Sequence, residues 1–192
     1  MRRAACIAMI AIMTTAGCAR PAIPPPVRYT IAPEISVETA PSTERTLGVR
    51  PVRAPVVYRT PILYTEGFKL REYSQAEWAV RPDHTITRAI IDAIVATGRF
   101  QDVGDASNVN RPELILVGDI RAFEIDHDAT PREAICEVRL ELRETFGTKL
   151  LWAGNLAARV PLEEDHISAV PKAMSEAVSR VANNAAAKIA QH

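Results

Sequence analysis

The clearest pattern in the chain is an almost strict alternation of apolar and charged residues over residues 132–144. The apolar members of this alternation are Ala134, Cys136, Val138, Leu140 and Leu142. A period of two over this length predicts a β-strand with one solvated face. Segments 113–126 and 149–160 also read as strands, and a turn containing Gly147 joins the last two. Three successive strands with short connections predict an antiparallel meander.

Two segments with apolar residues at helical spacing lie on either side of this meander. The first runs from about Pro82 to Thr97, with a proline at its start and Gly98 just beyond its end. The second runs from about Ile167 to Ala190 and is rich in alanine, which favours helix. Further strands are predicted near residues 47–52, 61–66 and 70–73. Together these elements predict an α+β fold, a two-layer sandwich with two helices packed on one face of an antiparallel sheet.

The sheet face away from the helices is a candidate docking surface. Its apolar residues on the segment 113–126 are predicted to be Ile115, Val117, Phe123 and Ile125. An exposed sheet face with scattered apolar residues can bind a partner, so Phe123 and Ile125 are predicted to contact one. The alternative is that loops partly bury both faces of the sheet.

The first 17 residues form a segment of a different kind. Arg2 and Arg3 precede an apolar run that is shorter than the roughly 20 residues of a transmembrane helix, which predicts a signal peptide over residues 1–17. The sequence TAGC that ends at Cys18 resembles the lipobox of bacterial lipoproteins, although Thr15 stands where leucine is usual. In such proteins the leader is cut before the cysteine, and the cysteine is then acylated. The resemblance implies that Cys18 is the membrane anchor, and the alternative is an ordinary cleaved signal.

Residues 18–46 are predicted to form the lipid anchor and a proline-rich tether, with the domain following at residues 47–192. Proline-rich chain is extended and semi-rigid. A short strand at residues 29–31 and complete disorder of the tether are equally open alternatives. Ala19 rather than Asp follows the cysteine, which in the lipoprotein resemblance implies the outer membrane and its periplasmic face.

Composition and motifs exclude several classes of function. The chain has 23 Lys and Arg against 23 Asp and Glu, and no basic run that suggests nucleic acid. Beyond the leader and the anchor only Cys136 remains, so no intrachain disulfide can form, and its apolar setting predicts an inert thiol. His127 and His166 have acidic neighbours but lack the paired spacing of a zinc site. We therefore expect no metal, no cofactor and no enzymatic activity.

Residues 47–90 carry a more specific motif. Its parts are Gly48-Val49-Arg50-Pro51-Val52, Pro55, Arg59-Thr60-Pro61-Ile62, Tyr73, Trp78-Ala79 and Pro82. This arrangement resembles the auxiliary lipoproteins of ABC-type transport systems, the group that includes the PqiC lipoprotein. Val57-Tyr58 and Asp83 depart from the usual family residues. Tyr73 and Trp78 are alternative contact residues, although a tryptophan just before a helix more often packs against the sheet.

The resemblance implies a docking or positioning component of a system that moves lipids between membranes. The implied partners are an MCE-domain protein, an inner-membrane permease and a cytoplasmic ATPase, and the resemblance also allows a ring of identical subunits. The transported molecule is left open. The alternative function is a structural or regulatory envelope lipoprotein that docks on a cell-wall synthase or a secretion assembly.

Overall fold

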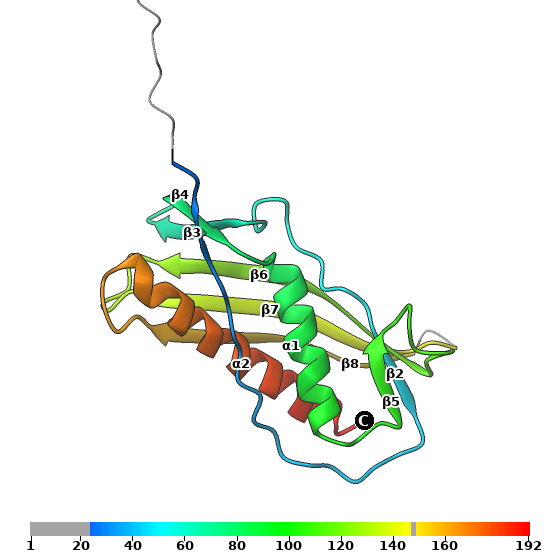
Figure 1. Cartoon of the computed structure of the whole chain (residues 1–192). Helices are drawn as coiled ribbons and strands as arrows, with labels where there is room; N and C mark the ends of the chain where they lie inside the picture. Colours follow the sequence, from blue (N-terminus) through cyan, green and yellow to red (C-terminus); the bar gives the residue numbers. More distant parts are fainter. Residues whose placement is uncertain (1–23, 147–148) are drawn as a thin grey trace, which may run out of the picture.

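The computed structural model describes residues 24–146 and 149–192, and these form an eight-stranded mixed sheet with two helices on one face (Figure 1). The elements in chain order are β1 (Val27–Tyr29), β2 (Thr46–Val49), β3 (Pro61–Glu66), β4 (Lys69–Trp78), α1 (Pro82–Ala96), β5 (Asp102–Asp105), β6 (Leu114–Asp126), β7 (Glu133–Glu144), β8 (Leu150–Pro161), the 3-10 turn η1 (Ile167–Ala169) and α2 (Val170–Ile189). In the described part of the chain, no helix has both the length and the apolar character needed to cross a membrane.

The meander of β6, β7 and β8 is antiparallel, which confirms the prediction for this part of the sheet. The prediction of a wholly antiparallel sheet is wrong, because the pairs β1–β4, β2–β5, β2–β6 and β3–β6 are parallel. The fold is therefore mixed α/β. Periodicity reports which face of a strand is buried and not the direction of its neighbour, so these four pairings had no local signal.

β6 is the strand on which the sheet branches. One of its edges pairs with β7 along nearly its whole length. The other edge pairs with β2 near Leu114 and with β3 near Ile125, and a single bridge from Arg53 to Asp119 lies between these two regions. Two small groups of strands, β2–β5 and β3–β4–β1, thus extend from opposite ends of the same edge (Figure 1).

The two helices cover one face of the sheet and pack against each other, as predicted (Figure 1). Their bounds agree with the sequence pattern, because α1 has a proline in its first turn and Gly98, at a φ of +64°, follows its end. The buried stripe of α1 includes Ile86, Ile90, Ala93 and Ile94. The alanine-rich stripe of α2 lies on β7 and β8. A hydrophobic core therefore fills the space between the helical layer and the sheet.

The proline-rich segment after residue 26 is part of the domain and not a free tether. β1 pairs with β4, and residues 30–37 then run along α2 as an extended strap. The backbone amides of Ala32, Glu34 and Ser36 donate hydrogen bonds to Ser175 Oγ (3.0 Å), Ser179 Oγ (2.8 Å) and Asn183 Oδ1 (3.2 Å). Two residues of extended chain advance about 6.7 Å, and four residues of helix advance about 6 Å. These two distances are similar enough for three successive hydrogen bonds to form between the strap and α2.

The strap also buries apolar side chains. Ile31, Ile35 and Val37 are partly buried against the core. The packed domain therefore begins at about Val27, and the predicted start at residue 47 is wrong.

Removing the hydroxyls that hold the strap should loosen it. We expect the double variant Ser175→Ala, Ser179→Ala to lose about 1 to 2 kcal/mol, since each such bond is worth about 0.5 to 1.5 kcal/mol. Urea unfolding measures the loss, and amide hydrogen exchange should accelerate at Ala32 and Glu34. Ser74→Ala, an exposed serine of β4, is the matched control and should change neither. Equal stability of the double variant and of Ser74→Ala would contradict a stabilising role of these hydrogen bonds.

Candidate functional site

The side chains of β6 change their alternation at a β-bulge between Ile120 and Ala122. Before the bulge Leu116 and Ile120 face the core, and after it Phe123 and Ile125 do, with 2% and 0% of their surface exposed. The prediction that Phe123 and Ile125 face outward is wrong, because one extra residue moves every later side chain to the opposite face. Neither residue is available to a partner in this structure.

Trp78 and Tyr73 have different surroundings. Trp78 ends β4, is 2% exposed, and packs edge-to-face on Phe123 with ring centroids 5.8 Å apart. This is the packing role expected of a tryptophan at the sheet edge. Tyr73 is partly exposed, and its hydroxyl lies 2.6 Å from Nε2 of His127. Of the four predicted contact residues, Tyr73 is the one that reaches the surface.

Tyr73 belongs to an aromatic cluster at one end of the sheet. Tyr64 of β3 stacks on His127 with centroids 4.1 Å apart, and its ring lies 4.9 Å from that of Tyr73. Arg132 and Asp165 form an ion pair beside this cluster. The hollow between them has a volume of about 380 Å³ and is lined by residues that include His127, Pro131, Arg132, Leu162 and Asp165. The β6–β7 turn and the loop after β8 thus meet the β3–β4 pair here.

Burial lowers the pKa of His127 below its ordinary value, and the charge of Arg132 lowers it further. The Tyr73 hydroxyl can donate to a bare Nε2 or accept from an Nε2–H, so this contact is compatible with either protonation state of the ring. Burial and the charge of Arg132 are what favour the neutral form.

Stability should depend on pH through His127. Because its pKa is lower in the folded chain than in the unfolded chain, this contribution is complete above about pH 6.5 and decreases as the pH falls toward the folded pKa. Urea unfolding between pH 7.5 and 5 should show this decrease, and His127→Gln should reduce the slope. The exposed His84 provides the control variant His84→Gln. The same slope in the wild-type and His127→Gln proteins would contradict the assignment.

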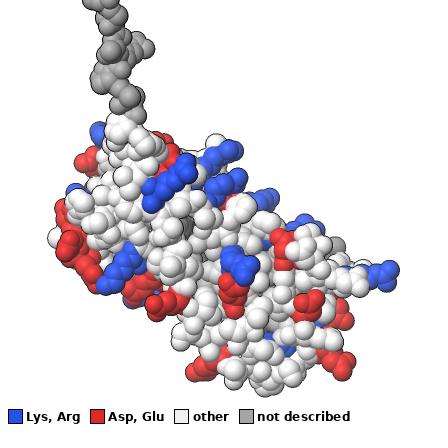
Figure 2. All heavy atoms as spheres, in the orientation of Figure 1, with Lys and Arg blue, Asp and Glu red and all other residues white. Residues whose placement is uncertain are grey.

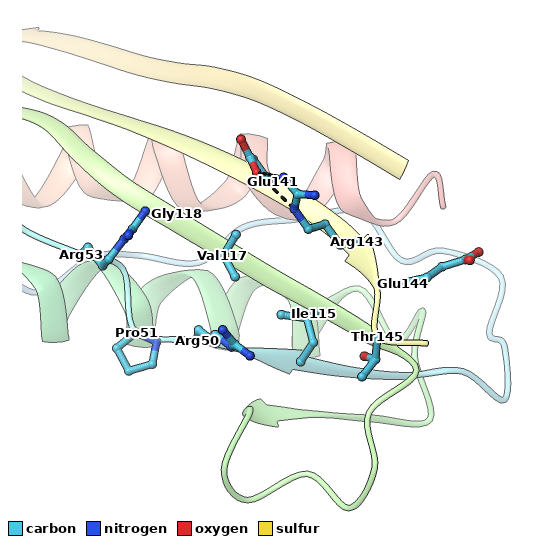
Figure 3. A pocket seen from close by; sticks show the side chains of 10 residues that line it. All are labelled: Arg50, Pro51, Arg53, Ile115, Val117, Gly118, Glu141, Arg143, Glu144 and Thr145. Atoms are coloured by element: carbon cyan, nitrogen blue, oxygen red, sulfur yellow. Dashed lines mark hydrogen bonds and ion pairs between the residues drawn. The ribbon is translucent and has the colours of Figure 1, made fainter. Parts of the chain in front are cut away.

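A second hollow lies on the open face of the sheet, away from the helices (Figure 3). Its volume is about 620 Å³. It is lined by Arg50, Pro51, Arg53, Ile115, Val117, Gly118, Glu141, Arg143, Glu144 and Thr145. We call it the open-face groove. Its floor is apolar, and charged side chains form its rim, which is typical of surfaces that bind another protein.

The walls of the open-face groove are fixed by hydrogen bonds and ion pairs. The Arg50 amide donates to the Leu116 carbonyl at 2.9 Å, and the Arg53 guanidinium lies 2.8 Å from Asp119. On the other wall, Arg143 donates to Glu141 at 2.6 Å, a bond that holds the pKa of Glu141 below its ordinary value. These contacts keep the segment after β2 against β6, so the groove is preformed.

The chemistry of the remaining candidates is inert. Cys136 is fully buried, and burial raises the pKa of its thiol to about 12, so it stays protonated. Within residues 24–146 and 149–192, no group of three or more His, Cys, Asp and Glu side chains could hold a metal ion.

A family model described as the ABC-type transport auxiliary lipoprotein component matches residues 29–186. The chain belongs to this family. The match runs from β1 to α2, so the strap is part of the family domain. No protein of curated function matches the sequence.

Solved structures show how widely this fold is shared. A crystal structure of a Xanthomonas campestris protein of the family DUF330 is similar at a TM-score of 0.78 and 19% identity, covering 86% of this chain and 95% of that one. A hypothetical protein from Chlamydia trachomatis is similar at a TM-score of 0.53 and 8% identity, covering 77% of this chain and 96% of that one. At these identities the likeness concerns the fold alone.

Sequence reasoning placed Ile115 and Val117 on this face, and both line the groove, but it missed the residues of the charged rim. Arg50 and Pro51 entered only as part of the family motif, and Arg143 lies within the alternation at residues 132–144, whose charged side was interpreted only as solvated. Their proximity depends on the segment after β2 lying along β6, a contact between segments more than 60 residues apart. The loop sequences after β2 carry no local signal of such a contact.

Proposed function

We propose that this chain is a non-catalytic component of an ABC-type transport system that moves lipids with an MCE-domain protein. It would be anchored through Cys18 to the outer membrane and face the periplasm. The observation that carries the proposal is the family match over residues 29–186. The lipobox-like cysteine lies only nine residues before Val27, which supports a domain held close to the membrane.

The open-face groove is the proposed contact for the MCE-domain protein. Its floor offers Ile115 and Val117, and its rim offers arginines that are held in place. Preformed surfaces bind with a smaller loss of entropy than mobile ones. The permease and ATPase would supply the energy for transport, and this chain would position the periplasmic part. The family match favours this function over a role on a cell-wall synthase or a secretion assembly.

Affinity capture of the tagged full chain after cross-linking in cells tests this function. We expect an MCE-domain protein in the captured material, and we expect Val117→Lys to reduce its amount about tenfold. Val117 faces Glu141 across the strands, so a lysine there finds an opposite charge and the fold is preserved.

The matched control is Val95→Lys, since Val95 is 53% exposed on α1, on the other side of the molecule. Unchanged capture by Val117→Lys would place the contact elsewhere. Capture of a cell-wall synthase or a secretion protein in place of MCE and permease proteins would contradict the proposed function itself.

A further inference from the structure

One edge of the molecule concentrates exposed apolar side chains. Of the nine large apolar residues that are exposed within residues 24–146 and 149–192, six lie in β1, in residues 54–60 and in the segment from β3 to Arg81. They are Val27 (57%), Val56 (77%), Val57 (43%), Phe68 (110%), Leu70 (41%) and Val80 (55%). We call these parts of the chain, residues 27–29 and 54–81, the β4 edge. Exposed apolar residues gathered in one place indicate a surface that binds something.

The β4 edge is also basic in a chain that is acidic elsewhere. It contains Arg28, Arg59, Lys69, Arg71 and Arg81, all exposed, against three acidic residues. The rest of the described chain carries 15 Lys and Arg against 20 Asp and Glu. In Figure 2 the Lys and Arg spheres are frequent along the upper part of the molecule, over β1, β3 and β4 as Figure 1 places them, and Asp and Glu spheres are frequent lower down. Such asymmetry orients a protein toward a negatively charged surface.

Phe68 is the most prominent residue of this edge. It lies at the tip of the β3–β4 hairpin, directly after Gly67, whose φ of +58° makes the tight turn. The Gly67 amide donates to Asp128 Oδ2 at 2.7 Å, so the tip is held against the β6–β7 turn. At the other end of the β3–β4 pair, Tyr58, buried and hydrogen-bonded to Glu124, holds the loop that carries Val56 and Val57. The apolar side chains are therefore presented by fixed backbone.

The start of the domain lies on the same edge. Val27 pairs with Ala76, and because β1 runs parallel to β4, the chain before Val27 approaches from the side of the hairpin tip. Eight residues, four of them proline, separate Cys18 from Val27. At roughly 3.1 Å per residue, the nine steps from Cys18 to Val27 would span about 28 Å. A lipid at Cys18 would thus keep the β4 edge near the bilayer.

A protein strand is a poorer match for this edge than a bilayer. Gln75 has a φ of +55°, which interrupts the strand geometry in the outer part of β4. Lys69 and Arg71 on that strand are the kind of charged residues that oppose strand addition. Basic and aromatic side chains together suit the headgroup region of an anionic membrane.

We propose that the β4 edge lies against the surface of an anionic phospholipid bilayer, with Phe68 among the headgroups. This inference rests on the anchor at Cys18 that the proposed function includes. One acyl chain gives only marginal binding, so a second contact would fix both the residence and the orientation of the domain. The open face of the sheet would then be held at a constant height above the membrane.

A fluorescent label at position 68 tests the proposal. Full-length acylated Phe68→Cys, extracted from membranes, is labelled with an environment-sensitive dye and reconstituted into vesicles of phosphatidylethanolamine and phosphatidylglycerol. Cys136 is buried and does not compete for the dye. We expect the emission to move to shorter wavelength, and doxyl-labelled lipids to quench it at least about twofold. Lys69→Glu with Arg71→Glu should abolish most of this quenching, as should vesicles of phosphatidylcholine alone.

The matched control is Phe146→Cys. Phe146 is 71% exposed in the turn after β7, at the opposite end of the sheet from the hairpin tip. At about 3.3 Å per residue along β6, the two sites are roughly 40 Å apart. The label at position 146 should remain as in water.

Flotation of the vesicles in 1 M salt separates this inference from the proposed function. A chain that floats while its label at position 68 stays in water overturns the membrane contact and leaves the anchor intact. A chain that does not float contradicts the anchor and with it both claims. Shielding of position 68 only when the MCE-domain protein is added would overturn the inference in favour of a protein contact.

Discussion

Replacing Phe123 with glutamate should prevent the domain from folding. Phe123 is 2% exposed and packs on Trp78, so the substitution removes a large apolar side chain from the core. Truncating a buried phenylalanine costs about 3 to 5 kcal/mol, and burying an unpaired carboxylate adds to this loss. A domain of this size is stable by only about 5 to 15 kcal/mol. Soluble yield and circular dichroism measure the effect, and we expect aggregated or unfolded protein.

The control is Ile115→Glu on the same strand. Ile115 lies before the bulge on the open face, directly opposite Arg143, so a glutamate there gains an ion-pair partner. We expect a change within about 1 kcal/mol. A folded Phe123→Glu protein of wild-type stability would contradict the burial of Phe123, and with it the bulge in β6.

The local parts of the fold could be predicted from the sequence. The alternation at residues 132–144 predicted β7, and helical spacing with Pro82 and Gly98 predicted α1 almost to the residue. These signals are local, because the period of side chains and the identity of the capping residues depend on neighbours a few positions away. The strands β3 and β8 were predicted for the same reason.

The bulge in β6 could not be predicted in this way. Like Ile115 and Val117, Phe123 and Ile125 occupy odd-numbered positions. An unbroken alternation along the strand would therefore put all four side chains on one face. One extra residue after Ile120 reverses this assignment, and the hydrogen bonds to β7 determine where it falls. Phe123 and Ile125 were misassigned for this reason alone, whereas Ile115 and Val117 lie on the open face as predicted.

The strap was misread although part of its signal was present. Its prolines favour an extended chain, and we interpreted them as a tether. Yet Ile31, Ile35 and Val37 lie at odd positions, with small or polar residues between them, which is the pattern of a chain packed on one side. Its polar partners on α2 lie some 145 residues away, so the sequence could not identify them.

The aromatic cluster, too, could be predicted only in part from the sequence. Tyr73 was a candidate contact and reaches the surface, whereas His127 was considered only for metal binding. Its actual neighbours Tyr64 and Tyr73 come from β3 and β4, which the parallel pairing of β3 with β6 brings beside it. Pairings of this kind depend on the topology of the whole sheet.

Replacing Cys18 with serine should remove the protein from the membrane. A serine has no thiol to acylate, so the lipid that would hold the mature chain is lost, and the contacts of the β4 edge alone would bind weakly and reversibly. We expect nearly all of the wild-type chain, and almost none of Cys18→Ser, in the outer-membrane fraction after a wash with 1 M salt. Sucrose-gradient fractionation of cells measures this distribution. Ser42→Ala, a substitution of one hydroxyl between the strap and β2, should leave the distribution unchanged.

The most direct test of a lipid-anchored transport component is the intact mass of the mature chain purified from that fraction. We predict a chain that begins at Cys18 and is heavier than its sequence by the mass of its acyl groups. A mature chain that begins elsewhere, or that carries no added mass, would contradict the anchor and the role at the membrane that depends on it.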